Sequence, residues 1–283
     1  MSAVWRGKPL FVAIFMMALT GLPCAARAQD AGSQSTPERP SINASALYLV
    51  DLKSGRVLLE KDATRRLPPA SLTKVMTALV AMETASPEQV VRVDRRALVH
   101  RSSLKLHPGE QFLLRDLLTA MLVTSANDAC EAIAWHVGGN ADRFVTMMNE
   151  RARTLGLENT HFANACGFDA PGHYSTATDL AKLTEHALDV PTISMIVRTV
   201  TRDIATVDGA RQVLLRTTNE LLLDPDVTGV KTGYTSKAGR CLIASMFKDG
   251  HRLLLVGLNV MDRWEQAPKL LRYGQVVLQT VNE

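Results

Sequence analysis

A serine and a lysine three residues apart, Ser71 and Lys74, are the first side chains of this 283-residue chain whose types and spacing could do chemistry. Pro68 and Pro69 precede them and suit the first turn of a helix, where a missing N–H costs nothing. On one helix face the two side chains would lie about 5–6 Å apart at Cβ. A serine hydroxyl is a weak nucleophile that needs a base, and a neutral lysine amine can be that base. Because S-x-x-K also occurs by chance, its meaning depends on the rest of the chain.

Two further triplets follow the first pair in a fixed order. Ser125-Ala126-Asn127 lies between two apolar helical segments, where a hydroxyl and an amide can project into a cleft. Lys231-Thr232-Gly233 lies on a predicted strand, where glycine lets a ligand approach the backbone closely. Each triplet alone carries little information, but the order and contexts together are highly specific: S-x-x-K, S-x-N and K-T-G are the motifs of penicillin-binding proteins and class A β-lactamases.

The chain resembles the low-molecular-mass penicillin-binding proteins, which are serine D-alanyl-D-alanine carboxypeptidases and endopeptidases. The similarity extends to residues 161–181, 214–222 and 227–245, and it runs from about Ala46 to Tyr273. Alanine stands at the middle of the S-x-N motif where better-known relatives have glycine or aspartate. The chain also stops without the β-rich second domain and amphipathic C-terminal anchor of the larger carboxypeptidases, so we expect no membrane anchor in the mature protein.

The resemblance implies a catalytic group of Ser71, Lys74 and Ser125. Ser71 would attack the carbonyl between two D-alanines, and its own N–H would help to form an oxyanion hole. Lys74 would be the neutral base, with its pKa lowered by burial, by a second lysine and by a helix dipole. Ser125 would relay a proton to the leaving amine together with Lys231.

A second group of residues is expected to bind the substrate. Asn127 would orient Lys74 and bind the substrate amide, and Thr232 would bind the substrate carboxylate. The N–H of Tyr234 would be the second oxyanion donor, and Arg263 would help to hold a free C-terminal carboxylate through its forked donors. The full expected binding set is Asn127, Lys231, Thr232, Gly233, Tyr234 and Arg263.

Several functions remain open at this stage. The main prediction is a carboxypeptidase that removes the terminal D-alanine of peptidoglycan stem peptides, with β-lactams as covalent inhibitors. An endopeptidase that cuts D-alanyl cross-links and an idle murein- or penicillin-binding module are the alternatives. The K-T-G segment is more similar to carboxypeptidases, whereas the single-domain length is more similar to endopeptidases. No E-x-x-L-N stretch lies between Ser125 and Lys231, which argues against an efficient β-lactamase.

Histidine and cysteine give no evidence for a metal or another cofactor. A site built on the three motifs needs no histidine, so His136, His161 and His173 are expected to be structural. The mature chain would keep Cys130, Cys166 and Cys241, an odd number that leaves at least one thiol unpaired within the chain. None lies in a C-x-x-C motif or a histidine-rich cluster, so small buried residues are expected and any disulfide pairing stays open.

The elements that must position these residues come from both ends of the chain. Residues 46–51 and 56–62 predict a β-hairpin, and 228–235 and 240–260 predict strands with a turn at Asp249-Gly250. Residues 69–197 show mainly helical spacing, and 265–281 predict a final helix. The result is an α+β protein with a helical region inserted into an antiparallel sheet, as in the β-lactamase/transpeptidase-like fold of the family.

The first 28 residues have the pattern of an export signal. A basic start, an apolar stretch over 10–24 and Ala26-Arg27-Ala28 match the three parts of such a signal. Residues 29–43 would be a disordered leader, and 44–283 the peptidase domain. Removing residues 1–28 leaves 29 basic and 28 acidic residues, so the near-neutral mature chain gives no argument for nucleic acid. A periplasmic location is expected.

Overall fold

The computed structural model describes residues 1–4, 7, 38–99 and 102–280. Most of the predicted export signal and leader therefore lies outside the described residues. Residues 36–283 form one compact unit, distinct from residues 1–35. Within the described residues, no helix is both long enough and apolar enough to cross a membrane.

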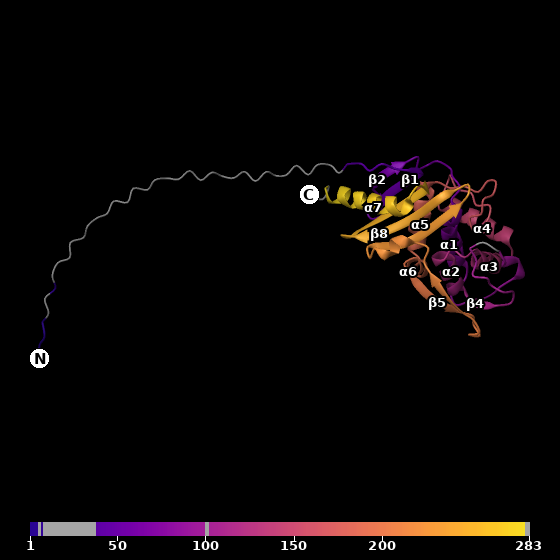
Figure 1. Cartoon of the computed structure of the whole chain (residues 1–283), viewed down its shortest axis with the longest axis horizontal. Helices are drawn as coiled ribbons and strands as arrows, with labels where there is room; N and C mark the ends of the chain where they lie inside the picture. The colour runs from indigo at the N-terminus through magenta and orange to yellow at the C-terminus, as the bar shows by residue number, and fades with distance from the viewer. Residues whose placement is uncertain (5–6, 8–37, 100–101, 281–283) are drawn as a thin grey trace. The chain divides into compact units, whose positions relative to one another are not determined.

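A five-stranded antiparallel sheet is assembled from both ends of the domain, as the sequence predicts (Figure 1). Its strand order is β2-β1-β9-β8-β7. The N-terminal hairpin pairs with β9, so residues about 200 positions apart in sequence lie side by side, with Tyr48 opposite Val256. The strand bounds are β1 Ala44–Asp51, β2 Val57–Lys61, β7 Val227–Thr235, β8 Gly239–Lys248 and β9 His251–Val260.

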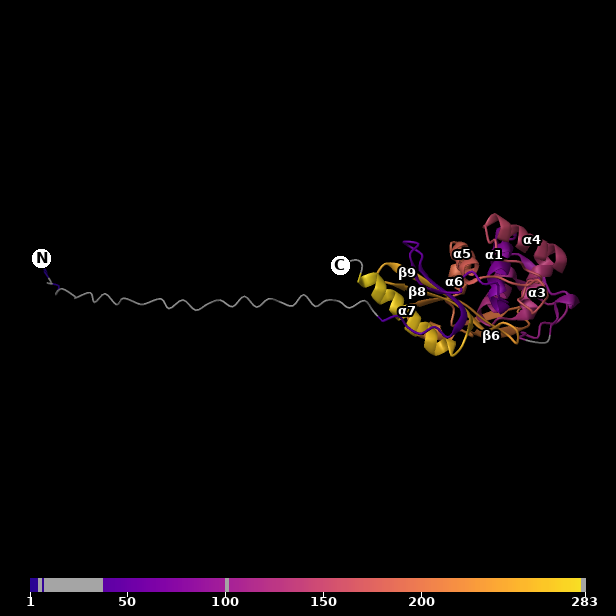
Figure 2. The ribbon, with the colours of Figure 1, turned by 90° about the horizontal axis from the view of Figure 1, so that it is seen from above.

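The side chains of the central strands point alternately into two cores, so both faces of the sheet are apolar. Leu253 and Leu255 of β9 pack in one core, whereas Leu254 and Val256 pack in the other. This is the period-2 alternation of a strand buried on both sides. Helix α7 (Arg263–Gln279) covers the first face, and the remaining helices lie on the second, as Figure 2 shows.

The inserted region is mainly helical, and its helix boundaries follow local signals. Gly139 and Gly156 take positive φ values of 74° and 64° just after two of the helices, a conformation that glycine adopts without a Cβ penalty. Thr176 caps the next helix by accepting a hydrogen bond from the N–H of Asp179. The helices are α1 Lys74–Thr84, α2 Leu114–Val123, α3 Asn127–Gly138, α4 Ala141–Thr154, α5 Ala177–Leu188 and α6 Pro191–Ile196.

Two short antiparallel ribbons depart from the expected pattern. The first pairs β3 (Val90–Arg92) with β4 (Gln111–Leu113), inside the region expected to be helical. The second pairs β5 (Thr201–Ala205) with β6 (Gln212–Arg216). The fold class is nevertheless confirmed: an antiparallel sheet with an inserted helical region.

Candidate active site

Ser71 lies in a short 3-10 helix, Ala70–Thr73, that leads into α1. The sequence predicted one continuous helix here, but Ala70 has a positive φ of 50°, and the regular α-helix starts only at Lys74. A Cβ added to Gly167 would lie 1.9 Å from the Ala70 carbonyl oxygen, so a glycine is required where this loop crosses the turn. The turn holds Ser71 half-buried at the positive end of a helix dipole.

Lys74 is fully buried, and three oxygens surround its amine. Its Nζ lies 3.1 Å from Ser71 Oγ, 2.7 Å from Asn127 Oδ1 and 2.7 Å from the Cys166 carbonyl oxygen. A neutral amine can donate its two N–H groups to the amide and carbonyl oxygens, which leaves its lone pair to accept the Ser71 proton. The arrangement therefore matches a nucleophile with its base.

Electrostatics favour that neutral form. Burial, followed by the positive charge of Lys231, holds the pKa of Lys74 well below its ordinary value. The carboxyl of Glu131 acts in the opposite direction, and burial raises the pKa of that carboxyl in turn. Desolvation is the larger effect, so the buried amine can be a base at neutral pH.

The S-x-N motif connects α2 to α3. Ser125 adopts a positive φ of 63°, which is uncommon for a residue with a Cβ and is typical of strained functional sites. Asn127 is the first residue of α3 and reaches Lys74 with its side-chain oxygen. Its backbone N–H donates to the Ser102 carbonyl at 2.6 Å, which fixes the start of the helix.

The K-T-G strand, β7, runs along the edge of the sheet beside Ser71. Lys231 is buried and donates from Nζ to the Thr232 carbonyl at 2.8 Å. Burial, then the charge of Arg263, lowers the pKa of Lys231 to about 7. A Cβ on Gly233 would lie 3.0 Å from the Ser71 backbone N, so a side chain at this position would crowd the expected oxyanion donor. Tyr234, next along, is exposed.

Arg263 begins α7 and reaches the K-T-G strand. Its Nη1 donates to the Gly233 carbonyl at 2.9 Å and to the Cys241 carbonyl at 3.1 Å. Its guanidinium also lies over the ring of Trp264, 4.5 Å from the centroid. The arginine thus sits at the edge beside K-T-G where the sequence placed it.

Thr218 is a site residue that the sequence reasoning did not single out. Its hydroxyl lies 2.7 Å from the Thr232 hydroxyl, and its N–H donates to the Val123 carbonyl at the end of α2. It therefore joins the K-T-G strand to the helix that precedes Ser125. Thr218 lies in the segment 214–222, which resembles the family, and this resemblance could have identified it as a site residue.

His173 supports the nucleophile's turn from behind. Its Nδ1 accepts from the Ala163 N–H at 2.9 Å, so the proton lies on Nε2, which donates to Thr73 Oγ1 at 2.9 Å. Thr73 then donates to the Ala70 carbonyl at 2.8 Å. Burial is the main cause that lowers the pKa of His173 to about 4. The neutral ring thus has the structural role expected for it.

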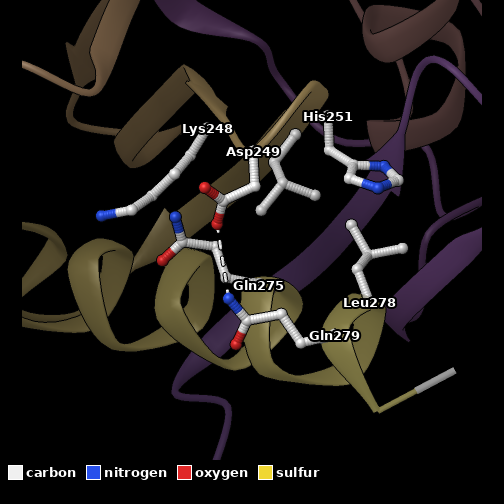
Figure 3. Close-up of a pocket in the computed structure, with 7 residues that line it drawn as sticks. Lys248, Asp249, His251, Gln275, Leu278 and Gln279 are labelled. Carbon is white, nitrogen blue, oxygen red and sulfur yellow. Dashed lines mark hydrogen bonds between the residues drawn. The ribbon is translucent and has the colours of Figure 1, made fainter. Parts of the chain in front are cut away.

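A cleft at the other end of the sheet lies away from the three motifs. It lies between the β8–β9 turn and α7, lined by residues that include Lys248, Asp249 and Gln279, and Gln279 donates to Asp249 at 3.3 Å (Figure 3). Cys241 of β8 pairs with Gly233 of the K-T-G strand. Lys248 lies seven residues further along β8, about 23 Å from Cys241. The cleft is therefore remote from Ser71.

Sequence comparison identifies the family. A family model described as D-alanyl-D-alanine carboxypeptidase matches residues 33–262. The chain belongs to the D-alanyl-D-alanine carboxypeptidase family. The resemblance drawn from the motifs is thus confirmed, and with it the predicted enzyme class, a serine peptidase.

Individual carboxypeptidases and a transpeptidase show the same relationship. The chain is 35% identical to the D-alanyl-D-alanine carboxypeptidase DacF of Bacillus subtilis, over 92% of this chain and 69% of DacF. A D-alanyl-D-alanine carboxypeptidase from Mycobacterium tuberculosis superposes with a TM-score of 0.80 at 31% identity, covering 85% of this chain and 94% of that one. A Streptomyces K15 DD-transpeptidase variant gives 0.78 at 29% identity, covering 83% and 99%.

Proposed function

We propose that this protein removes the terminal D-alanine from peptidoglycan stem peptides through an acyl-enzyme at Ser71. The observation that carries the proposal is the buried amine of Lys74, 3.1 Å from the Ser71 hydroxyl and held by two other oxygens. A hydroxyl paired with a neutral base is the requirement for nucleophilic attack on an amide carbonyl.

In acylation, Ser71 Oγ bonds to the carbonyl carbon between the two D-alanines while its proton moves to Lys74 Nζ. The N–H groups of Ser71 and Tyr234 bind the oxyanion. Both lie next to Gly233, the residue at which β7 comes close to the Ser71 backbone. Ser125, together with Lys231, then relays that proton from Lys74 to the leaving amine, so that Lys74 is neutral again. The C–N bond breaks, free D-alanine leaves, and the peptide stays on Ser71 as an ester.

In deacylation, water attacks the ester carbonyl and the peptide leaves with a new carboxylate. The Ser71 oxygen regains its proton, so the enzyme returns to its starting state.

The Thr232 hydroxyl and the Arg263 guanidinium bind the terminal carboxylate of the incoming substrate. The pairing of Thr232 with Thr218 orients that hydroxyl.

Penicillin provides the direct test of this assignment. β-Lactams mimic acyl-D-alanyl-D-alanine, and ring opening by Ser71 leaves an ester that hydrolyses slowly. Intact mass after penicillin treatment should show one adduct, and Ser71→Ala should show none. An adduct that persists in Ser71→Ala would reject the assignment of the nucleophile.

Muropeptide digestion distinguishes the activities. Purified monomeric stem peptides should lose one D-alanine, as measured by mass. Cleavage of cross-linked dimers into monomers without that loss would instead identify an endopeptidase. An adduct with penicillin but no turnover of either substrate would identify an idle binding module.

Export to the periplasm belongs to the same proposal, because peptidoglycan lies outside the cytoplasmic membrane. The basic and apolar start of the chain and its Ala26-Arg27-Ala28 triplet support it. The intact mass of protein recovered from a periplasmic extract should correspond to a chain that begins at Gln29. Recovery of the full-length chain only from the cytoplasm would reject export.

A further inference from the structure

A disulfide joins the two segments on either side of Lys74. Cys130 of α3 is bonded to Cys166, 36 residues later, in the segment between α4 and α5, with Cα atoms 5.9 Å apart. Both cysteines are buried. The sequence predicted small buried cysteines and left open whether any two of them pair. The remaining mature-chain cysteine, Cys241, is free and buried, as the odd count requires.

Each half of the disulfide lies next to an oxygen that holds the amine of Lys74. Cys166 provides its own carbonyl oxygen, 2.7 Å from Nζ. Cys130 lies one helical turn after Asn127, whose Oδ1 is also 2.7 Å from Nζ. The covalent bond therefore fixes the spacing between the two acceptors, although they come from different parts of the chain.

We propose that the Cys130–Cys166 disulfide is a positioning device for Lys74. It holds the two acceptors at the spacing where both N–H groups of the neutral amine are used and its lone pair faces Ser71. This inference rests on the proposed function, because it concerns the base of the acylation step. It adds two residues, neither of which touches the substrate, to the machinery that sets the acylation rate.

The Cys166 segment is irregular chain that is buried at Ala165 and Cys166, and polar contacts hold it to α1 and to itself. Thr77 donates from Oγ1 to the neighbouring Ala165 carbonyl at 2.5 Å, and Asn164 Oδ1 accepts from the N–H groups of Gly167 and Phe168 at 2.8 and 2.9 Å. Without the disulfide, this loop can move away from α3, since loops of this kind open more easily than packed helices. The carbonyl of Cys166 would move with it.

Loss of the disulfide should also change the charge state of Lys74. The charged groups that act on its amine are Lys231 from β7 and Glu131 from α3, and Glu131 Oε1 lies 3.3 Å from Cys166 Sγ. Opening the loop admits water, which lessens the desolvation that holds the lysine pKa low. The pKa then rises, more of the amine is protonated at neutral pH, and fewer molecules have a competent base.

Cys130→Ser, Cys166→Ser and the double variant test the proposal, with labelled penicillin as the probe across a range of pH. The acylation rate constant at neutral pH should fall by about 10–100-fold, the cost of a misplaced catalytic group. The three variants should lose the same factor, because each breaks the same bond. The acid limb of the pH profile should move to higher pH. Leu271→Ala, in the core under α7, is the control for general destabilisation and should leave that limb in place.

Reduction of the folded wild-type protein tests the same point without a substitution. Dithiothreitol should slow its acylation to the level of the variants and should leave the variants unaffected. Alkylation in denaturant, with and without reduction, should place the reducible pair at Cys130 and Cys166 by peptide mapping.

Two results would overturn the proposal. One is a folded double variant with wild-type rate and pH profile; the other is a pair of free thiols at these positions in the exported protein. Failure of the proposed function would give a different result. Wild-type protein that has not been reduced would then form no Ser71 adduct with labelled penicillin.

Discussion

At the scale of single residues, Lys74 is the group on which the proposed chemistry depends. Its low pKa comes from burial and from Lys231, so the amine can accept a proton that an ordinary surface lysine could not. The sequence could supply the identity of this proposed base through the motif. It could not identify the Cys166 carbonyl as a hydrogen-bond partner of Lys74, because every residue has a backbone oxygen and no residue type marks the one that is used.

Lys74→Arg should nearly abolish acylation, although it keeps the positive charge. A guanidinium does not release its proton, so it cannot accept one from Ser71. We expect the acylation rate constant to fall at least about 10³-fold, as when a nucleophile loses its activator. The measurement is the rate of adduct formation with labelled penicillin at neutral pH. Near-normal acylation would show that another residue is the base.

Arg263→Ala tests whether this arginine reads the substrate carboxylate. The value of kcat/KM for a free D-alanyl-D-alanine peptide should fall about 10–100-fold, or roughly 1.4–3 kcal/mol. Cleavage of a cross-linked dimer whose scissile bond has no adjacent terminal carboxylate should suffer less. Peptide release and dimer cleavage are both measured by mass.

The ratio between the two substrates is the informative quantity, because Arg263 also supports the K-T-G strand. Its hydrogen bond to the Gly233 carbonyl holds this strand whichever substrate is bound. Its charge also helps to keep the pKa of Lys231 low. Those contributions should lower both activities together, so equal losses would reject Arg263 as the carboxylate reader.

At the scale of elements, the 3-10 turn that carries Ser71 depends on the buried, neutral His173. The folded-state pKa is about 4, below the ordinary 6.5, so folding favours the neutral ring. The unfolded chain binds this proton first as the pH falls, and the associated stability is lost between pH 6.5 and about 4. This loss is at most about 3 kcal/mol.

His173→Gln should remove that part of the pH dependence. Glutamine keeps a donor for Thr73 but does not titrate, so its unfolding free energy should vary less with pH than the wild-type value does between about 4 and 6.5. Urea unfolding at several pH values gives both curves. Parallel curves over this window would show that the ring titrates alike in the folded and unfolded chain.

The elements show where sequence patterns suffice. The helical region expected over 69–197 and the turn at Asp249-Gly250 follow from apolar spacing and turn residues. The structure has α2 and α3 in the first and the β8–β9 connection at the second. The β5–β6 ribbon was missed although Asp208-Gly209 marks its turn, because its strands are mostly exposed and lack a clear alternation. The disulfide was open because pairing depends on tertiary contact rather than on spacing.

At the scale of the whole domain, the sheet separates two cores with different tasks. Leu271 of α7 is fully buried in the core on one face. Leu72, beside Ser71, is fully buried in the core on the other face, with the inserted helices. Both cores stabilise the fold, but the second alone surrounds Ser71 and Lys74. The predicted α+β class followed from strands at both ends of the chain; the division of tasks required the observed strand register.

Leu271→Ala and Leu72→Ala therefore form a matched pair at equal burial. Each should lower the free energy of unfolding by about 2–5 kcal/mol, the usual cost of this truncation in a core. Leu271 lies eight residues along α7 from Arg263, about 12 Å, so its loss should reach the site only weakly. Acylation of folded Leu271→Ala should stay within about twofold of wild type, the limit for independent sites.

Leu72→Ala should slow acylation as well, because the cavity lies under the turn that orients the Ser71 hydroxyl and misplacement of about 1 Å can cost 10²-fold. Urea unfolding and labelled-penicillin kinetics, both well below the thermal transition, separate the two effects. If Leu271→Ala slowed acylation as much as Leu72→Ala, the sheet would transmit packing defects from one face to the other. The two cores would then act as one unit, and the catalytic geometry would depend on α7 as much as on α1.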